Sequence, residues 1–303
     1  MAYSLEQFAV RGMLSDEVVP VKVVQERNSG NILVLKSVPV NFEDSGTAET
    51  IVKEVKGQFL ANDATVTSFY DSFYENRAIH IMMEYMDQGS LFDVYTAAGS
   101  IPEDVLATIA ARALEGLAFL HHKREPHIIH RSIKPSNILL NHDGQVKLTD
   151  FGHSRQLDNS YSGAKTVVGG VSKTTRGFLC YSSPERINAA KYSYNSDIWS
   201  LGLSILEAAT GRFPYRDVNE YYDLLDIIVD EPHPEPPAGA SEEFVEFINK
   251  CLDHEPADRL ETMDLLSDDK FIERGRENPV DLAGFLASLR EHNPRYDEKF
   301  PRL

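Results

Sequence analysis

The sequence predicts an α+β chain with two segregated lobes: a small β-rich N-lobe with one main helix (residues 1–86) and a larger helical C-lobe (residues 87–303). Two patterns support this division. In the first part, short apolar segments alternate with turn residues, as in antiparallel strands. From Ser100 onward, apolar residues recur with the period of helices. We expect the connection between the lobes at residues 86–89.

Two hairpins are predicted in the N-lobe. Segment 18–24 is rich in valine and segment 32–35 is a continuous apolar run, with turn residues at 28–31 between them. The second hairpin covers residues 69–83 and turns at 75–77. Both are antiparallel pairs of the kind that forms a small sheet.

Helices are predicted in three places. One over residues 49–60 is the main helix of the N-lobe. A long helix follows Ser100, which with Glu103 has the spacing of a capping box. The most apolar helix lies around 198–208 and ends at Gly211. The apolar stripe of the long helix comprises Leu106, Ile109, Ala113, Leu117 and Leu120.

Composition and charge limit the range of functions. The net charge of −17 opposes binding to nucleic acid or an anionic membrane, although its simplest meaning is solubility. No apolar run is long enough to span a bilayer, and the first residues resemble neither a secretory signal nor a lipidation site. Two cysteines fit a reducing compartment. We expect a cytoplasmic or nuclear protein.

Three motifs occur in an order that suits phosphoryl transfer. Lys36 follows the apolar run and is expected at the end of its strand. The segment His130-Arg131-Ser132-Ile133-Lys134-Pro135-Ser136-Asn137 follows the long helix, and Asp150-Phe151-Gly152 follows a short hairpin predicted around residues 143–144. Phosphoryl transfer needs cations and carboxylates that position the phosphates and Mg²⁺. Each motif is weak alone, but together they indicate a phosphotransfer site.

These motifs resemble those of the eukaryotic protein kinase family, over essentially the whole chain. The resemblance implies the bilobal protein kinase fold and an ion pair between Lys36 and Glu54 of the N-lobe helix. It also implies that Ser183-Pro184-Glu185 closes the activation segment, and that Arg259 pairs with Glu185.

Within that family the chain resembles the MAP kinase kinases. The similar segments are 83–91, 134–139, 196–204 and the C-terminal stretch 280–286. The resemblance implies partners among the kinases of a MAP kinase cascade: an upstream kinase, a paralogous MAP kinase kinase or a MAP kinase. The helix expected around 282–289 is where an upstream kinase would dock.

The resemblance also shows what this chain lacks. The family places a catalytic aspartate where this sequence has Ser132, and a neutral hydroxyl cannot act as the general base. Lys134, Asn137 and Asp150 are retained as catalytic residues, and Asn137 and Asp150 would hold Mg²⁺. Phe178 replaces a threonine that normally supports the missing aspartate.

The expected nucleotide site is altered as well. The three glycine positions of the phosphate loop fall on Leu14, Asp16 and Val19, and Asp16 would repel a triphosphate unless it points to solvent. Val34 would crowd the adenine. By resemblance, the remaining nucleotide-binding residues are Val21, Lys36, Glu54, Met83, Glu84, Met86 and Leu139.

These departures predict a MAP kinase kinase-like pseudokinase, catalytically impaired, that acts as a scaffold or allosteric regulator. Two alternatives are a weakly active ATP-dependent dual-specificity kinase acting on a MAP kinase, and a nucleotide sensor without turnover. We expect ATP and Mg²⁺ to bind weakly and not to be required. Ser160 and Thr174 lie where the family is phosphorylated, with Arg131 and Arg155 as partners for the new charge.

Overall fold

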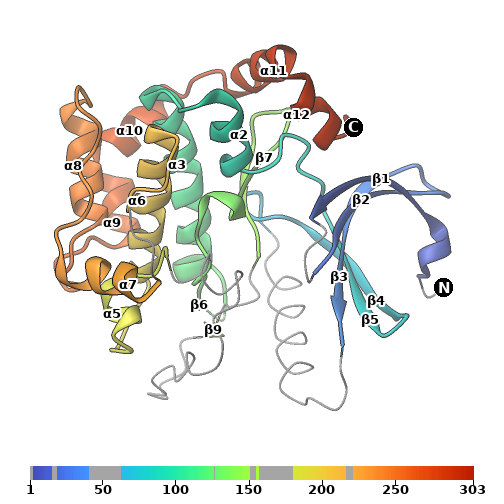
Figure 1. Ribbon diagram of the computed structural model, residues 1–303, viewed down its shortest axis with the longest axis horizontal. Helices are drawn as coiled ribbons and strands as arrows, with labels where there is room; N and C mark the ends of the chain where they lie inside the picture. The colour runs from blue at the N-terminus through green and yellow to red at the C-terminus, as the bar shows by residue number, and fades with distance from the viewer. Residues whose placement is uncertain are drawn as a thin grey trace.

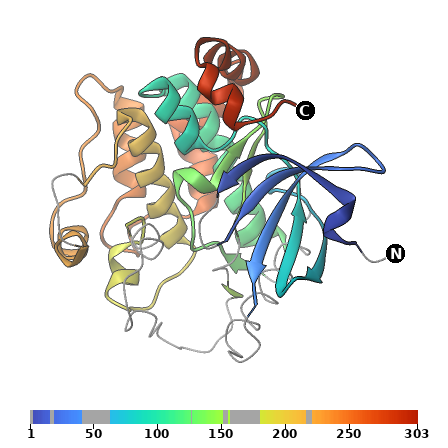
Figure 2. The same ribbon diagram turned by 45° about the vertical axis from the view of Figure 1, so that its right-hand side comes forward.

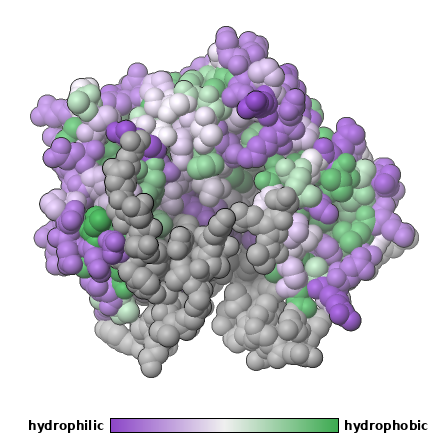
Figure 3. Space-filling view, in the orientation of Figure 1, coloured by the Kyte–Doolittle hydropathy of each residue, from purple (hydrophilic) through white to green (hydrophobic). Residues whose placement is uncertain are grey.

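The computed structural model describes residues 3–15, 19–40, 63–125, 127–150, 155–156, 180–215 and 221–303. A β-sheet forms one lobe, and most of the helices form the other, beside it (Figure 1). The chain therefore has the α+β, bilobal architecture that the sequence predicts. The described face in Figure 3 is largely hydrophilic, as the net charge leads one to expect. Among the described residues, no helix is both long and apolar enough to cross a membrane.

The sheet of the N-lobe is antiparallel, and its described part has five strands in the order β1-β2-β3-β5-β4. Both predicted hairpins are present. The turn between β4 and β5 places Asn76 and Arg77 at positive φ, the backbone of a tight hairpin turn. The elements are η1 (Leu5–Gln7), β1 (Phe8–Ser15), β2 (Val21–Glu26), β3 (Ile32–Pro39), β4 (Phe69–Glu75) and β5 (Ala78–Met83).

Alternation along β3 gives the sheet two different faces. Leu33 and Leu35 pack with Phe8 in a cluster on the outer face. Val34 packs on the inner face with Met83, its partner in the register of β3 and β5. Lys36 has the same parity as Val34, so it also faces the helical lobe.

The helical lobe is built around α3 (Glu103–Ala118) and α6 (Asn195–Thr210), whose apolar side chains are buried in one large core. All five residues of the predicted stripe are buried, and α6 ends at Gly211 in the left-handed conformation, as predicted. The other helices are α2 (Leu91–Ala98), a π-helical turn (Phe119–Lys123), α5 (Pro184–Ile187), α7 (Tyr221–Asp230), α8 (Glu242–Cys251), α9 (Thr262–Asp268), α10 (Lys270–Glu277), α11 (Leu282–His292) and α12 (Pro294–Lys299).

Two short antiparallel strand pairs lie within residues 128–156. The pair β7 (Ile138–Leu140) and β8 (Val146–Leu148) forms the hairpin predicted around residues 143–144. A second pair joins β6 (Ile128–Ile129) to β9 (Arg155–Gln156). Between β6 and β7, a 3₁₀ turn spans Pro135–Asn137.

Two local predictions were wrong. Ser100 and Glu103 form no capping box, because α3 begins only at Glu103, after Pro102. The amide of the next residue, Ile101, instead donates to Ala208 at the end of α6, and the carboxylate of Glu103 accepts from the amide of Ser241 at 3.0 Å. Lys36 does not end its strand, since β3 continues to Pro39.

Candidate functional site

The segment that carries Ser132 is fixed by one buried carboxylate. Asp197, in the first turn of α6, accepts hydrogen bonds from the amides of His130 at 2.7 Å and Arg131 at 2.8 Å, and from His121 at 2.9 Å. Burial alone would raise the pKa of Asp197, but interactions with His121, His130 and the Arg131 amide together outweigh burial, so the pKa lies below its usual value. The anion therefore holds the loop, including Arg131 at a positive φ of 67°.

Ser132 and Asn137 face each other within this loop. The amide nitrogen of Asn137 donates to the carbonyl of Ser132 at 2.7 Å and to its hydroxyl at 3.0 Å. Both side chains are buried. The position at which a kinase needs an anion is thus occupied by a neutral group that is already hydrogen-bonded.

Lys36, Asp150 and Asn137 meet across the two lobes. The ammonium of Lys36, on β3, lies 3.3 Å from one carboxylate oxygen of Asp150. The amide nitrogen of Asn137 lies 3.5 Å from the other oxygen, at the limit of a hydrogen bond. Asp150 adopts a positive φ of 69°, a costly conformation that aims its carboxylate between the lobes.

Lys134 lies at the start of the 3₁₀ turn, where its carbonyl accepts from the amide of Asn137 at 2.9 Å. Its side chain is half-buried and forms no ion pair with the described residues. The three residues that the sequence predicts as catalytic, Lys134, Asn137 and Asp150, thus lie within one short stretch of loop and strand.

The structure describes several of the residues predicted for the nucleotide site, whose role in binding stays a prediction. Val34 and Met83 are neighbours on the inner face of the sheet, and Leu14 and Val21 pack against the same cluster. Leu139 on β7, in the helical lobe, is half-buried, and it forms an antiparallel β-bridge with Ser90 of the linker. Val19 lies just before β2 and is half-buried.

The linker between the lobes, residues 84–90, contains an ion pair that sequence reasoning missed. Lys147 of β8 donates to both carboxylate oxygens of Glu84, at 2.7 and 2.9 Å, and the amide of Ser68 also donates to Glu84. The Glu84 side chain is therefore engaged within the protein.

Some predicted residues lie outside the described part of the chain. The list comprises Asp16, Glu54, Phe151, Gly152, Ser160, Thr174 and Phe178. Only the backbone of Arg155 is described. The Lys36–Glu54 ion pair, the phosphate-loop charge and the phosphorylation sites therefore stay predictions.

The predicted pair of Glu185 and Arg259 is confirmed. Their side chains form two hydrogen bonds, at 2.9 and 3.2 Å, and the arginine side chain is completely buried. The guanidinium also lies over the ring of Trp199, 5.1 Å from its centroid. This contact ties α5 to the core of the helical lobe.

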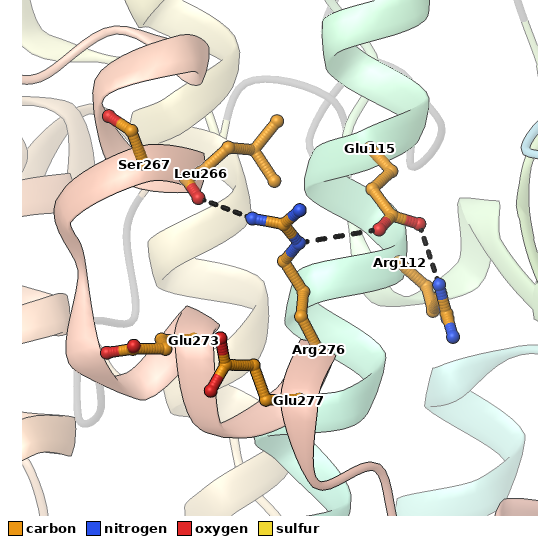
Figure 4. Close-up of a pocket in the computed structure, with 7 residues that line it drawn as sticks. All are labelled: Arg112, Glu115, Leu266, Ser267, Glu273, Arg276 and Glu277. Atoms are coloured by element: carbon orange, nitrogen blue, oxygen red, sulfur yellow. Dashed lines mark hydrogen bonds and ion pairs between the residues drawn. The ribbon is translucent and has the colours of Figure 1, made fainter.

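A hollow between α3, α9 and α10 in the helical lobe carries no comparable chemistry among its lining residues. Figure 4 shows Arg276 between the carboxylate of Glu115, at 3.8 Å, and the carbonyl of Leu266, at 2.7 Å. Arg112 also pairs with Glu115. Since these charges satisfy one another, we assign no site there. Its lining residues are Arg112, Glu115, Leu266, Ser267, Glu273, Arg276 and Glu277.

The protein kinase domain family matches residues 17–271. The chain belongs to the protein kinase family. Mitogen-activated protein kinase kinase 1 of Arabidopsis thaliana is 38% identical over 88% of this chain and 77% of its own length. Mitogen-activated protein kinase kinase SIPKK of Nicotiana tabacum is 41% identical over 88% of this chain and 74% of its own length. Within the protein kinases, the chain belongs to the MAP kinase kinases.

This membership explains the arrangement of the site. Lys36 on the sheet, Asn137 in the 3₁₀ turn and Asp150 after β8 are brought together as the kinase motif set leads one to expect, and their roles as cation and metal ligands stay predictions. The kinase motif set predicted them. It did not predict Lys147 with Glu84, because a lysine on a short strand gives no signal that it will be buried against the linker.

Proposed function

We propose that this MAP kinase kinase is a pseudokinase: a poor phosphotransferase that acts as a scaffold or allosteric regulator in a MAP kinase cascade. The observation that carries the proposal is Ser132. Its hydroxyl accepts a hydrogen bond from Asn137 and has no charge with which to remove the proton of a substrate hydroxyl. General-base assistance contributes roughly 10²- to 10⁴-fold to a rate, so its loss leaves a slow catalyst.

The proposal includes weak nucleotide binding. Asp150 supplies a carboxylate and Asn137 an amide oxygen, which are hard oxygen donors of the kind that Mg²⁺ takes together with phosphates. Lys36 would contact the phosphates, at the price of its ion pair with Asp150. Bound Mg²⁺ would offset phosphate charge. Leu14 and Val19, in place of glycines, keep the loop backbone from close approach to the phosphates.

The partners would be other kinases of the cascade. The relatives are named as MAP kinase kinases, which supports an upstream kinase, a paralogue or a MAP kinase as partner. The helix α11 covers the segment 282–289 predicted to dock an upstream kinase. A binding function needs only the retained fold, since it uses surfaces rather than the phosphotransfer centre.

One titration tests whether the protein binds nucleotide, which both the sensor and the weak kinase require. Thermal unfolding is followed with increasing ATP, with and without Mg²⁺, for the natural chain and for Asp150→Asn. We expect small Mg²⁺-dependent stabilisation that Asp150→Asn removes. Absence of any shift at millimolar ATP would exclude both the sensor and the weak kinase.

A kinase assay then tests catalysis itself. Homogeneous protein is mixed with ATP, Mg²⁺ and a MAP kinase, beside Lys36→Met as the control. We expect incorporation near background for both proteins. A rate like that of an ordinary kinase, abolished by Lys36→Met, would overturn the pseudokinase proposal.

A further inference from the structure

The C-terminal segment crosses back over the linker between the lobes. In Figure 1 and in the turned view of Figure 2, α12 lies beside the linker and close to β1. Residues 290–301 contain three buried side chains, Arg290, Tyr296 and Phe300. Their burial shows that this segment is packed against the rest of the protein.

Arg290 joins the segment to the linker. The Arg290 side chain is only 4% exposed and donates to the carbonyl of Asp87 at 3.1 Å. The same guanidinium donates to the carbonyl of Phe300 and pairs with the carboxylate of Asp297. It also lies 3.8 Å from the carboxylate of Asp87. A buried arginine with this many acceptors fixes the backbones it joins.

The next two linker residues are held in the same way. The hydroxyl of Tyr296 donates to the carbonyl of Gln88. The ring of Phe300 packs on Gly89, where a Cβ atom would come within 2.4 Å of the ring. Gly89 has a positive φ of 68°, so both its conformation and this contact require glycine.

The segment also touches the lobes on either side of the linker. Pro301 accepts a hydrogen bond from the hydroxyl of Tyr85 at 2.9 Å and packs against Gly12 of β1 in the N-lobe. Lys299 pairs with Asp93 of α2 in the helical lobe at 2.6 Å. One short stretch of chain thus contacts the sheet, the linker and a helix.

We propose that residues 290–301 form an intramolecular strap that holds the linker in one conformation and limits the movement of the lobes. Short linkers between lobes absorb the backbone changes of hinge motion. Here Tyr85, Asp87, Gln88 and Gly89 each contact the strap. A linker bound along its length cannot change its backbone angles until those contacts break. The proposal concerns lobe movement and does not depend on nucleotide binding or catalysis.

Amide hydrogen exchange of the linker tests the strap. Arg290→Met removes the central cation, and Tyr296→Phe removes one hydroxyl with little change in shape. We expect exchange of the amides at 84–90 to quicken about tenfold or more in Arg290→Met, and by a smaller factor in Tyr296→Phe. The same amides in the natural chain should be well protected.

Arg274→Met is the matched control. Arg274 on α10 also forms several ion pairs, with Glu103, Asp104 and Glu243, but on the helical lobe away from the linker. Its loss should lower stability without selectively quickening exchange at 84–90. Equal quickening in Arg274→Met and Arg290→Met would mean that general destabilisation explains the effect and would overturn the strap.

Lobe movement is measured separately by spin labels. Cysteines replace the exposed Tyr74 on β4 and Ser267 on α9, in a Cys180→Ser background, and pulsed electron resonance gives the distance distribution between them. We expect a narrow distribution that broadens with Arg290→Met. A distribution equally narrow in both proteins would contradict the proposal, even if the linker amides exchanged faster.

Discussion

The side-chain amide of Asn137 donates a hydrogen bond to the Ser132 hydroxyl over 3.0 Å. A carboxylate at position 132 would find the same donor in place, while Lys36 and Asp150 are already 3.3 Å apart. Because Lys36, Asn137 and Asp150 are retained, Ser132→Asp should restore part of the missing base catalysis. We expect phosphate transfer to a MAP kinase to rise by roughly 10²-fold in an initial-rate assay.

Ser132→Ala is the control for that substitution. It removes the hydroxyl and keeps the carbonyl that Asn137 contacts at 2.7 Å, so the loop should stay folded. We expect its rate to equal that of the natural chain, because the hydroxyl contributes nothing to proton removal. A large loss in Ser132→Ala would show that the serine takes part in catalysis.

The Glu185–Arg259 pair gives a prediction about stability. Arg259→Met would leave the Glu185 carboxylate buried beside an apolar side chain, and breaking a buried pair costs about 3–5 kcal/mol. Urea unfolding should show this loss. The double variant Glu185→Gln with Arg259→Met should lose less than the two single variants together, since it leaves no uncompensated charge. Strict additivity would contradict a direct interaction.

Sequence patterns predicted the fold well because local and tertiary preferences agree there. The hairpin at residues 69–83 has strand residues around a tight turn, and Leu106 to Leu120 keep one helical face. The kinase motifs brought Lys36, Asn137 and Asp150 together because their order fixes their elements. Where a single pattern competed with a tertiary contact, as at Ser100, the contact decided the outcome.

The strap and the Glu84–Lys147 pair were not predictable in this way. Each depends on partners far apart in the sequence, and neither Arg290 nor Lys147 differs locally from an exposed basic residue. The spacing of Tyr296 and Phe300 indicates one apolar face on a short helix. It does not indicate what that face covers.

Gly211 gives a prediction about helix termination. It ends α6 at a φ of 69°, and a Cβ atom there would come within 1.6 Å of the Gly99 carbonyl oxygen. Gly239 also has a positive φ, but a Cβ would meet nothing within 4 Å. Gly239→Ala should therefore cost about 1 kcal/mol of backbone strain, and Gly211→Ala roughly 3 kcal/mol more from overlap. Similar losses in urea unfolding would contradict this contact.

The buried histidines lead us to predict that the free energy of unfolding decreases as the pH is lowered. Burial lowers the pKa of His80, and the Nε2–H of its neutral ring donates to the carbonyl of Glu75 while Nδ1 accepts from the Ser37 hydroxyl at 2.9 Å. The His80 ring takes up a second proton near pH 6.5 in the unfolded chain, but only at a lower pH in the folded chain. The contribution of His80 is thus complete above pH 6.5 and is lost as the pH falls towards the lowered pKa.

His80→Gln should flatten this dependence. Urea unfolding between pH 7.5 and about 5 should show a smaller decline than in the natural chain, by at most the slope of one proton. A residual decline should remain, because burial also lowers the pKa of His122, His130 and His254. His292→Gln, at an exposed position, is the control. If His292→Gln flattened the profile as much as His80→Gln, burial of the His80 ring would not be the cause.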